Sequence, residues 1–166
     1  MKRWLVRAFL LLVLAALGIW GWRVWFPGPE QIIRKELNQL AQLASVAPHE
    51  APLKKLATAQ QLAAFFTKDT QISVDIPGRS TFTINGRDEV RDNALGSRAL
   101  GSSFTVEFID VNITVAPDRQ TAVVRLTAKA NIPGDTVPQV QELKLDFKQV
   151  DKDWLINRVE TVRTLH

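Results

Sequence analysis

Carboxylates are the side chains of this sequence best suited to acid–base chemistry, because other groups that commonly transfer protons in enzymes are scarce. The 166 residues contain no cysteine or tyrosine and only two histidines, His49 in a predicted loop and His166 as the last residue. Two such scattered histidines give no zinc spacing, and no thiol nucleophile exists. Glu107 and Asp110 flank a break in the alternation of a strand predicted over residues 104–115. Such a break indicates a β-bulge, which could turn one carboxylate into a pocket with a raised pKa. On a solvated strand edge the same carboxylates would have no function.

Arg158 is the candidate for binding an anion. The alternation of the last predicted strand, residues 154–164, places Arg158 on the same face as Trp154 and Ile156. There it would either point into a hollow under the sheet or lie at the rim of the sheet. Apolar side chains could line that hollow or form ordinary core, and they are Phe65, Phe82, Phe108, Leu145 and Trp154. We predict no metal and no cofactor, since the sequence also lacks a phosphate-binding glycine loop.

Hydrophobic spacing predicts the elements that would position these residues. Apolar residues recur at helical spacing in residues 30–45, 53–66 and 87–100, and Arg98 falls on the polar side of the third helix. Alternation with a period of two predicts strands over residues 72–76, 80–84, 104–115, 122–130, 143–148 and 154–164. The last four strands have short connections, so we expect an antiparallel meander. The order favours an α+β fold, a strongly curved sheet whose hollow is filled by helices.

Two short motifs carry a family resemblance. Residues 84–90, INGRDEV, are typical of a strand that enters a helix through glycine, and residues 150–156, VDKDWLI, of a polar turn before a last strand. With this order of elements, residues 30–165 resemble the nuclear transport factor 2-like (SnoaL-like, cystatin-like) superfamily. The resemblance implies a cone-shaped, curved antiparallel sheet wrapped around helices. It also implies that any enzyme activity, as in ketosteroid isomerase, scytalone dehydratase or SnoaL-type cyclases, would use acid–base groups in the hollow.

Residues 4–26 predict one transmembrane helix. At about 1.5 Å per residue this stretch would span roughly 34 Å, enough for a hydrocarbon core of about 30 Å. The side chains expected at the membrane interfaces are Trp4, Arg7, Trp20, Trp22, Arg23 and Trp25. Positive charge is concentrated before the stretch, so we expect residues 1–3 in the cytoplasm. Residues 27–29 would be a short linker, and residues 30–166 a domain outside the cytoplasmic (inner) membrane, in the periplasm of a bacterium. A cleaved signal peptide is the alternative, although no good cleavage site follows the apolar run.

Charge excludes one class of partner. Four of the 21 basic residues lie in the first 26 positions, which contain no acid, so the remainder carries 17 basic and 17 acidic side chains. A domain with this balance lacks the excess positive charge that nucleic-acid-binding proteins use, so nucleic acid is not expected as a partner. The sequence therefore predicts a membrane-anchored, extracytoplasmic, non-catalytic binding or envelope-assembly module. It would hold a small apolar ligand in its hollow, or bind a second copy or an envelope protein through its sheet face. The alternative is an isomerase, dehydratase or hydrolase that acts on a small lipophilic substrate.

Overall fold

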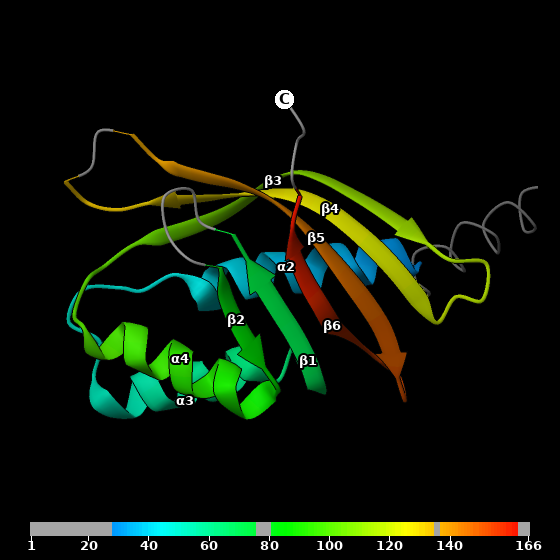
Figure 1. Cartoon of the computed structure of the whole chain (residues 1–166). Coiled ribbons are helices and arrows are strands. Elements are labelled where there is room, and N and C mark those ends of the chain that lie inside the picture. Colours follow the sequence, from blue (N-terminus) through cyan, green and yellow to red (C-terminus); the bar gives the residue numbers. More distant parts are fainter. Residues whose placement is uncertain (1–27, 76–80, 135–136, 163–166) are drawn as a thin grey trace, which may run out of the picture.

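A computed structural model describes residues 28–75, 81–134 and 137–162 of the chain (Figure 1). Within these residues, helices and strands follow the predicted α+β order. Their bounds are α2 Pro29–Ala44, α3 Pro52–Ala63, β1 Phe66–Val74, β2 Phe82–Asn85, α4 Arg87–Ala99, β3 Thr105–Val115, β4 Thr121–Asn131, β5 Gln139–Val150 and β6 Asp153–Thr161. Prolines begin α2 and α3, where the missing N–H costs nothing. The second helix ends earlier than predicted, because the chain passes into β1 at Phe66.

The strands form one six-stranded sheet in the order β2-β1-β6-β5-β4-β3. Strands β3 to β6 make the predicted antiparallel meander. The prediction of a wholly antiparallel sheet is wrong, however, because β1 runs parallel to β6, with Phe66 beside Ile156 and Ile72 beside Val159. No hairpin joins these two strands, so no tight turn forces them to run in opposite directions.

Two irregularities within the meander of β3 to β6 change which side chains face the core. The pairing of β3 with β4 shifts between Ile109 and Asn112, and Asp110 has a φ of 54°. This confirms the predicted bulge. A second shift lies in β6, where Phe147 pairs with Ile156 but Asp146 pairs with Arg158, so Asn157 has no partner across from it on β5. Each extra residue reverses the alternation beyond it.

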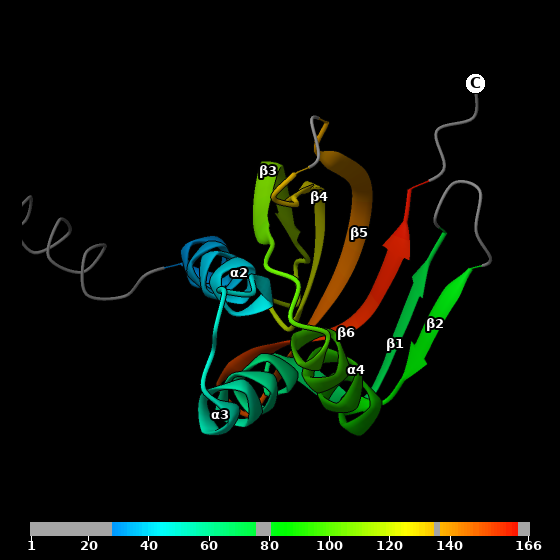
Figure 2. The same cartoon turned by 90° about the vertical axis from the view of Figure 1, so that its left-hand side faces the viewer.

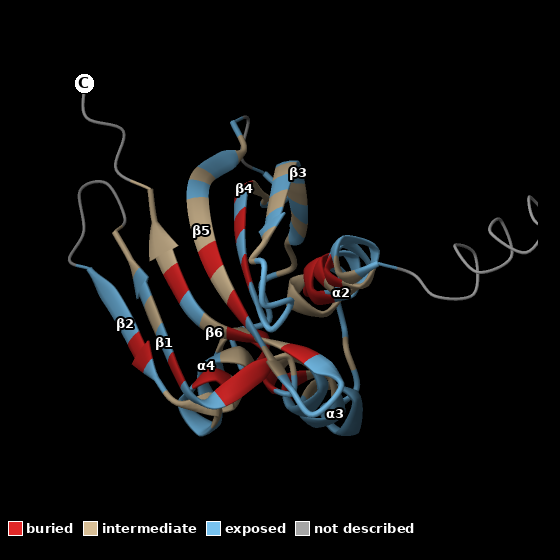
Figure 3. Cartoon of the chain, turned by 90° about the vertical axis from the view of Figure 1, so that its right-hand side faces the viewer, coloured by how far each residue is buried: buried red, intermediate tan, exposed pale blue. Residues whose placement is uncertain are grey.

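The helices lie on the inner face of the curved sheet (Figure 2). Helix α2 contacts β3, and α3 and α4 pack side by side. Figure 3 shows buried positions along β4, β5 and β6. They form the core with Ile33, Leu37 and Leu40, the apolar face of α2. The structure therefore has the predicted cone-like arrangement of helices inside a sheet.

The predicted transmembrane segment, with its interface residues Trp4, Arg7, Trp20, Trp22, Arg23 and Trp25, lies outside the described residues. Within the part of the chain that is described, no helix has the length and apolar character needed to cross a bilayer.

Candidate functional site

A cleft with a volume of about 1020 Å³ opens between α2 and α3. Its walls come from the second half of α2, one side of α3, the segment 45–50 that joins the two helices, and residues 103–105 before β3. Apolar side chains form much of its surface, and the larger ones are Leu43, Val46, Phe65 and Phe104. The amides of Gln39, Gln42 and Gln61 lie among them. The cleft thus combines an apolar surface with groups that donate and accept hydrogen bonds.

Backbone hydrogen bonds fix one wall of this cleft. The N–H of Val46 donates to the carbonyl of Phe104 over 2.8 Å, and the N–H of Phe104 donates back over 3.1 Å. Next to them, the N–H of Val106 donates to Oγ of Ser45 over 2.9 Å. These bonds tie the end of α2 to the start of β3, so this wall of the cleft is preformed.

A buried ion pair supports the segment that joins α2 to α3. Nη1 of Arg98, on α4, lies 3.2 and 3.0 Å from the two carboxylate oxygens of Glu50, and the two side chains are 1% and 5% exposed. Nη2 of Arg98 also donates to the carbonyl oxygens of Leu43 and Ser45 at the end of α2. The prediction that Arg98 lies on the polar side of its helix is wrong, because these acceptors compensate its charge in the interior.

The same contacts decide the charge of Glu50. Burial alone would raise the pKa of this carboxyl group, but the hydrogen bonds and charge of Arg98 outweigh it, helped by the N–H of Ala47 and the charge of Lys54. The pKa of Glu50 is therefore lowered below its ordinary 4.5. Glu50 lines the cleft as an ionised carboxylate that is already paired, which makes it a poor general base.

Glu36 is a partly buried carboxyl group that no pattern in the sequence indicated. Its position on α2 lies beside the core residues Ile33, Leu37 and Leu40, and one carboxylate oxygen is buried without a hydrogen-bond partner. The pKa of Glu36 is raised from 4.5 to about 7, mainly by burial and secondly by the nearby carboxylate of Asp153, while a hydrogen bond from the N–H of Trp154 opposes both. Glu36 is not among the residues that line the cleft. In the sequence, Glu36 is a polar residue next to the apolar face of its helix, and nothing in that pattern distinguishes it from an exposed glutamate.

Glu36→Gln is expected to stabilise the protein at pH 8 but not at pH 4.5. The folded state binds the Glu36 proton more tightly than the unfolded state does, so ionisation of Glu36 costs stability as pH rises through about 5 to 7. Glutamine removes that cost, worth about 1–2 kcal/mol after allowance for partial exposure to water. Calorimetric Tm values at both pH values, with exposed Glu30→Gln of the same helix as the control, measure the difference. An equal Tm change at both pH values would contradict this reading of Glu36.

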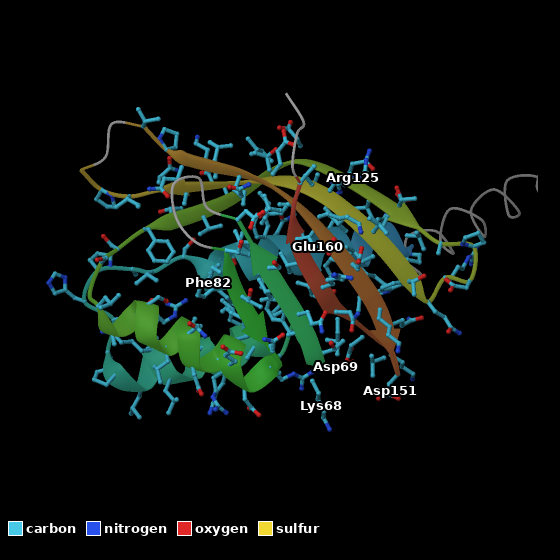
Figure 4. The ribbon with its side chains drawn as sticks, viewed as in Figure 1. Lys68, Asp69, Phe82, Arg125, Asp151 and Glu160 are labelled. Atoms are coloured by element: carbon cyan, nitrogen blue, oxygen red, sulfur yellow. The ribbon has the colours of Figure 1, made fainter. Side chains whose placement is uncertain are left out.

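The apolar candidates from the sequence lie in different places. Phe65 lines the cleft. Leu145 and Trp154 are core residues, 2% and 1% exposed, and Phe108 packs against that core. Phe82 lies on the edge strand β2 and is 45% exposed (Figure 4). Only one of the five therefore contributes to the cleft.

The polar candidates lie on the outer face of the sheet, the face turned away from the helices. Glu107 is exposed and pairs with Lys129 over 3.9 Å, and Asp110 is exposed at the bulge. Arg158 pairs with Glu160 over 2.7 Å. The expectation that Arg158 shares a face with Trp154 and Ile156 is wrong, because the extra residue Asn157 reverses the alternation between them.

Other charged groups give no site of comparable shape. On the outer face, Lys144 lies 3.4 Å from Asp146 of the same strand and 3.7 Å from Glu160 of the neighbouring strand β6, so these charges already have partners within the face. Figure 4 shows Glu160 on β6 and Arg125 on β4. A smaller hollow of about 560 Å³ lies where Lys68 and Asp69 of β1 approach Asp151 (Figure 4). Both signs of charge line it. The described residues contain no cluster of metal-ligating side chains.

Comparison with known proteins identifies the architecture. No family model matches the chain, and no curated protein matches it. A solved nuclear transport factor 2-like protein with a cystatin-like fold from Novosphingobium aromaticivorans superposes with a TM-score of 0.61, covering 90% of this chain and 86% of that one at 17% identity. The chain has the cystatin-like fold.

Other solved structures that superpose on this chain belong to differently named proteins. Aln2 from a Streptomyces species has a TM-score of 0.60 at 12% identity, over 83% of this chain and 94% of that one. A candidate scytalone dehydratase from Novosphingobium aromaticivorans has a TM-score of 0.56 at 17% identity, over 82% and 84%. At such identities the likeness extends to the fold alone. The function therefore has to be argued from the cleft of this chain.

Proposed function

We propose that the chain is a membrane-anchored, extracytoplasmic, non-catalytic module that binds a small, largely apolar molecule in the cleft between α2 and α3. The observation that carries this proposal is the cleft itself. Its volume of about 1020 Å³ lies at the upper end of the range of small-molecule sites. Burial of apolar ligand surface against Leu43, Phe65 and Phe104 would supply affinity. The neighbouring glutamine amides would orient the ligand.

The lining favours binding over catalysis. An acid–base enzyme needs a group within hydrogen-bond reach of the substrate with a pKa near the working pH. Glu50 is the carboxylate in the cleft, and Arg98 occupies both of its oxygens. The anchor and the location outside the cytoplasm rest on the sequence of residues 4–26. Intact mass of the mature protein tests the anchor, because removal of those residues by a signal peptidase would overturn it.

Gln61→Trp is expected to weaken binding at least tenfold. Gln61 lines the cleft from α3, so an indole there would occupy the volume that the ligand needs. Its neighbour Gln60 is also exposed but does not line the cleft, which makes Gln60→Trp the matched control. The probe is 2-naphthalenemethanol, titrated by calorimetry into the full chain in phosphatidylcholine nanodiscs, with empty nanodiscs as the blank. Absence of binding to the unmodified chain, or equal binding by the two variants, would overturn the proposal.

Glu36 is the observation that favours the alternative, an isomerase, dehydratase or hydrolase acting on a lipophilic substrate. A carboxyl group with a pKa of about 7 suits general acid–base catalysis. Its place outside the lining of the cleft is the argument against this role. If a bound naphthalene probe changes the pKa of Glu36, as measured by carboxyl NMR, the group is in contact with the site and the enzyme alternative becomes the better one.

Self-association or docking of an envelope protein on the outer face stays a prediction. Its charges already form ion pairs within the face, such as Lys144 with Glu160 and Arg158 with Glu160, so they do not by themselves require a partner. Sedimentation of the full chain in nanodiscs tests for a homodimer, because a dimer gives nanodiscs that carry two copies of the chain rather than one.

A further inference from the structure

The charged groups that line the cleft leave one positive charge unmatched. Glu50 is paired with Arg98 through both carboxylate oxygens. Lys54 also lines the cleft, from the first turn of α3, and it has no ion-pair partner among the described residues. Its charge contributes to the lowered pKa of Glu50, so its ammonium group lies near that wall. The cleft therefore offers an available cation beside an apolar surface.

The start of α3 adds to this positive potential. The helix begins after Ala51, and no side chain caps its first N–H groups. Unsatisfied N–H groups give the N-terminus of a helix a partial positive charge, which favours anions nearby. Its 12 residues are enough for a substantial dipole. Lys54 and the N-terminus of α3 thus both contribute positive potential to this part of the cleft.

We propose that the cleft selects an amphipathic anion, an apolar body that carries one acidic group such as a carboxylate. The apolar body lies against Leu43, Phe65 and Phe104, and the acidic group lies at Lys54. This inference rests on the proposed binding function and names the class of its ligand. A cationic ligand of the same shape is disfavoured, because Glu50 is held by Arg98 and Lys54 repels a second positive charge.

The uncharged groups of the lining are compatible with this choice. The side-chain amides of Gln39, Gln42 and Gln61 can donate to a carboxylate oxygen as well as accept from a neutral ligand. They therefore do not discriminate by charge. Discrimination is expected to come from Lys54, because a hydrogen bond between two charged groups is stronger than one between neutral groups.

The test compares three probes that differ only in their polar group. They are 2-naphthoate, 2-naphthalenemethanol and 2-naphthylmethylammonium, each titrated into the full chain in phosphatidylcholine nanodiscs at pH 7.4. The variants are Lys54→Gln and its matched control Lys55→Gln, a neighbour on the same helix that does not line the cleft. We expect naphthoate to bind tightest. Lys54→Gln is expected to weaken naphthoate about three- to tenfold and to leave 2-naphthalenemethanol unchanged.

Each result decides between the two proposals. Naphthoate that binds no tighter than the alcohol, or an equal effect of Lys54→Gln and Lys55→Gln, overturns the anion selectivity but leaves the binding function intact. Failure of all three probes to bind overturns both. Unchanged alcohol binding by Lys54→Gln shows that the cleft of the variant is still folded. A naphthoate affinity that falls with added salt in the unmodified chain, but not in Lys54→Gln, further supports the charge contact.

Discussion

Arg98→Met is expected to lower the free energy of unfolding by about 3–5 kcal/mol, because it leaves Glu50 buried without its counter-charge. The substitution also removes the donor to the carbonyl oxygens of Leu43 and Ser45, where α2 ends. Hydrogen exchange of peptides from β4 and β5 in the full chain reads this free energy directly. The cleft should lose its 45–50 wall at the same time, so probe binding should fall with stability.

The control for Arg98→Met is Arg91→Met on the same helix. Arg91 forms exposed ion pairs with Asp88 and Asp92, so its loss is expected to cost less than about 1 kcal/mol. The double variant Arg98→Met/Glu50→Gln should recover part of the loss, since it removes the uncompensated charge. The lowered pKa of Glu50 means that the pair stabilises the fold above pH 4.5 and that this contribution is lost as pH falls below it. Equal losses for the Arg98 and Arg91 variants would show that the pair is solvated.

Trp154→Ala is expected to be similarly damaging, with a loss of about 3–5 kcal/mol. Trp154 is 1% exposed and is one of the largest buried side chains of the core cluster that also contains Ile33 and Ile156, so alanine would leave a cavity in that core. Trp154→Phe should cost clearly less, because much of the volume stays filled. Hydrogen exchange in the full chain again gives the free energy of unfolding.

The Trp154→Ala variant also distinguishes two roles of an aromatic residue in this fold, lining a ligand pocket and packing in the core. If Trp154 lined an open hollow, Trp154→Ala would leave stability nearly unchanged and alter the affinity for naphthalene probes. The structure places it in the core instead. A stability change of less than about 0.5 kcal/mol together with altered binding would contradict that placement.

The elements of the fold were largely predictable from the sequence because each has a strong local period. The apolar stripe of α2 and the alternation of β4 are consequences of burial on one side, which the residue types reveal directly. The direction of β1 was not predictable in this way, because its partner β6 lies far along the chain. The place of Arg158 was missed because one unpaired residue, Asn157, reverses the alternation without a change in composition.

The cleft could not be predicted from the sequence for a different reason. Its walls come from α2, the segment 45–50, α3 and residues 103–105, so no single motif contains it, and the one aromatic candidate from the sequence that lines it is Phe65. Arg98 and Glu50 are 48 positions apart, and each alone is an ordinary surface residue type. Only the folded arrangement makes them a buried pair that holds a wall of the cleft and leaves Lys54 as the unmatched charge.

The position of β6 in the sheet has a consequence for how the chain folds. The last strand lies between β1 and β5 rather than at an edge, and it brings Trp154 and Ile156 into the core. During synthesis, β1 and β2 can therefore pair with the rest of the sheet only after β6 has left the ribosome. Joining Phe66 to Ile156 closes a long loop, which makes this pairing slow compared with local hairpins. Until β6 pairs, the edges of β1 and β5 that it will occupy are exposed and could pair with strands of other chains. Correct folding of this domain therefore requires β6 to insert faster than the exposed edges aggregate.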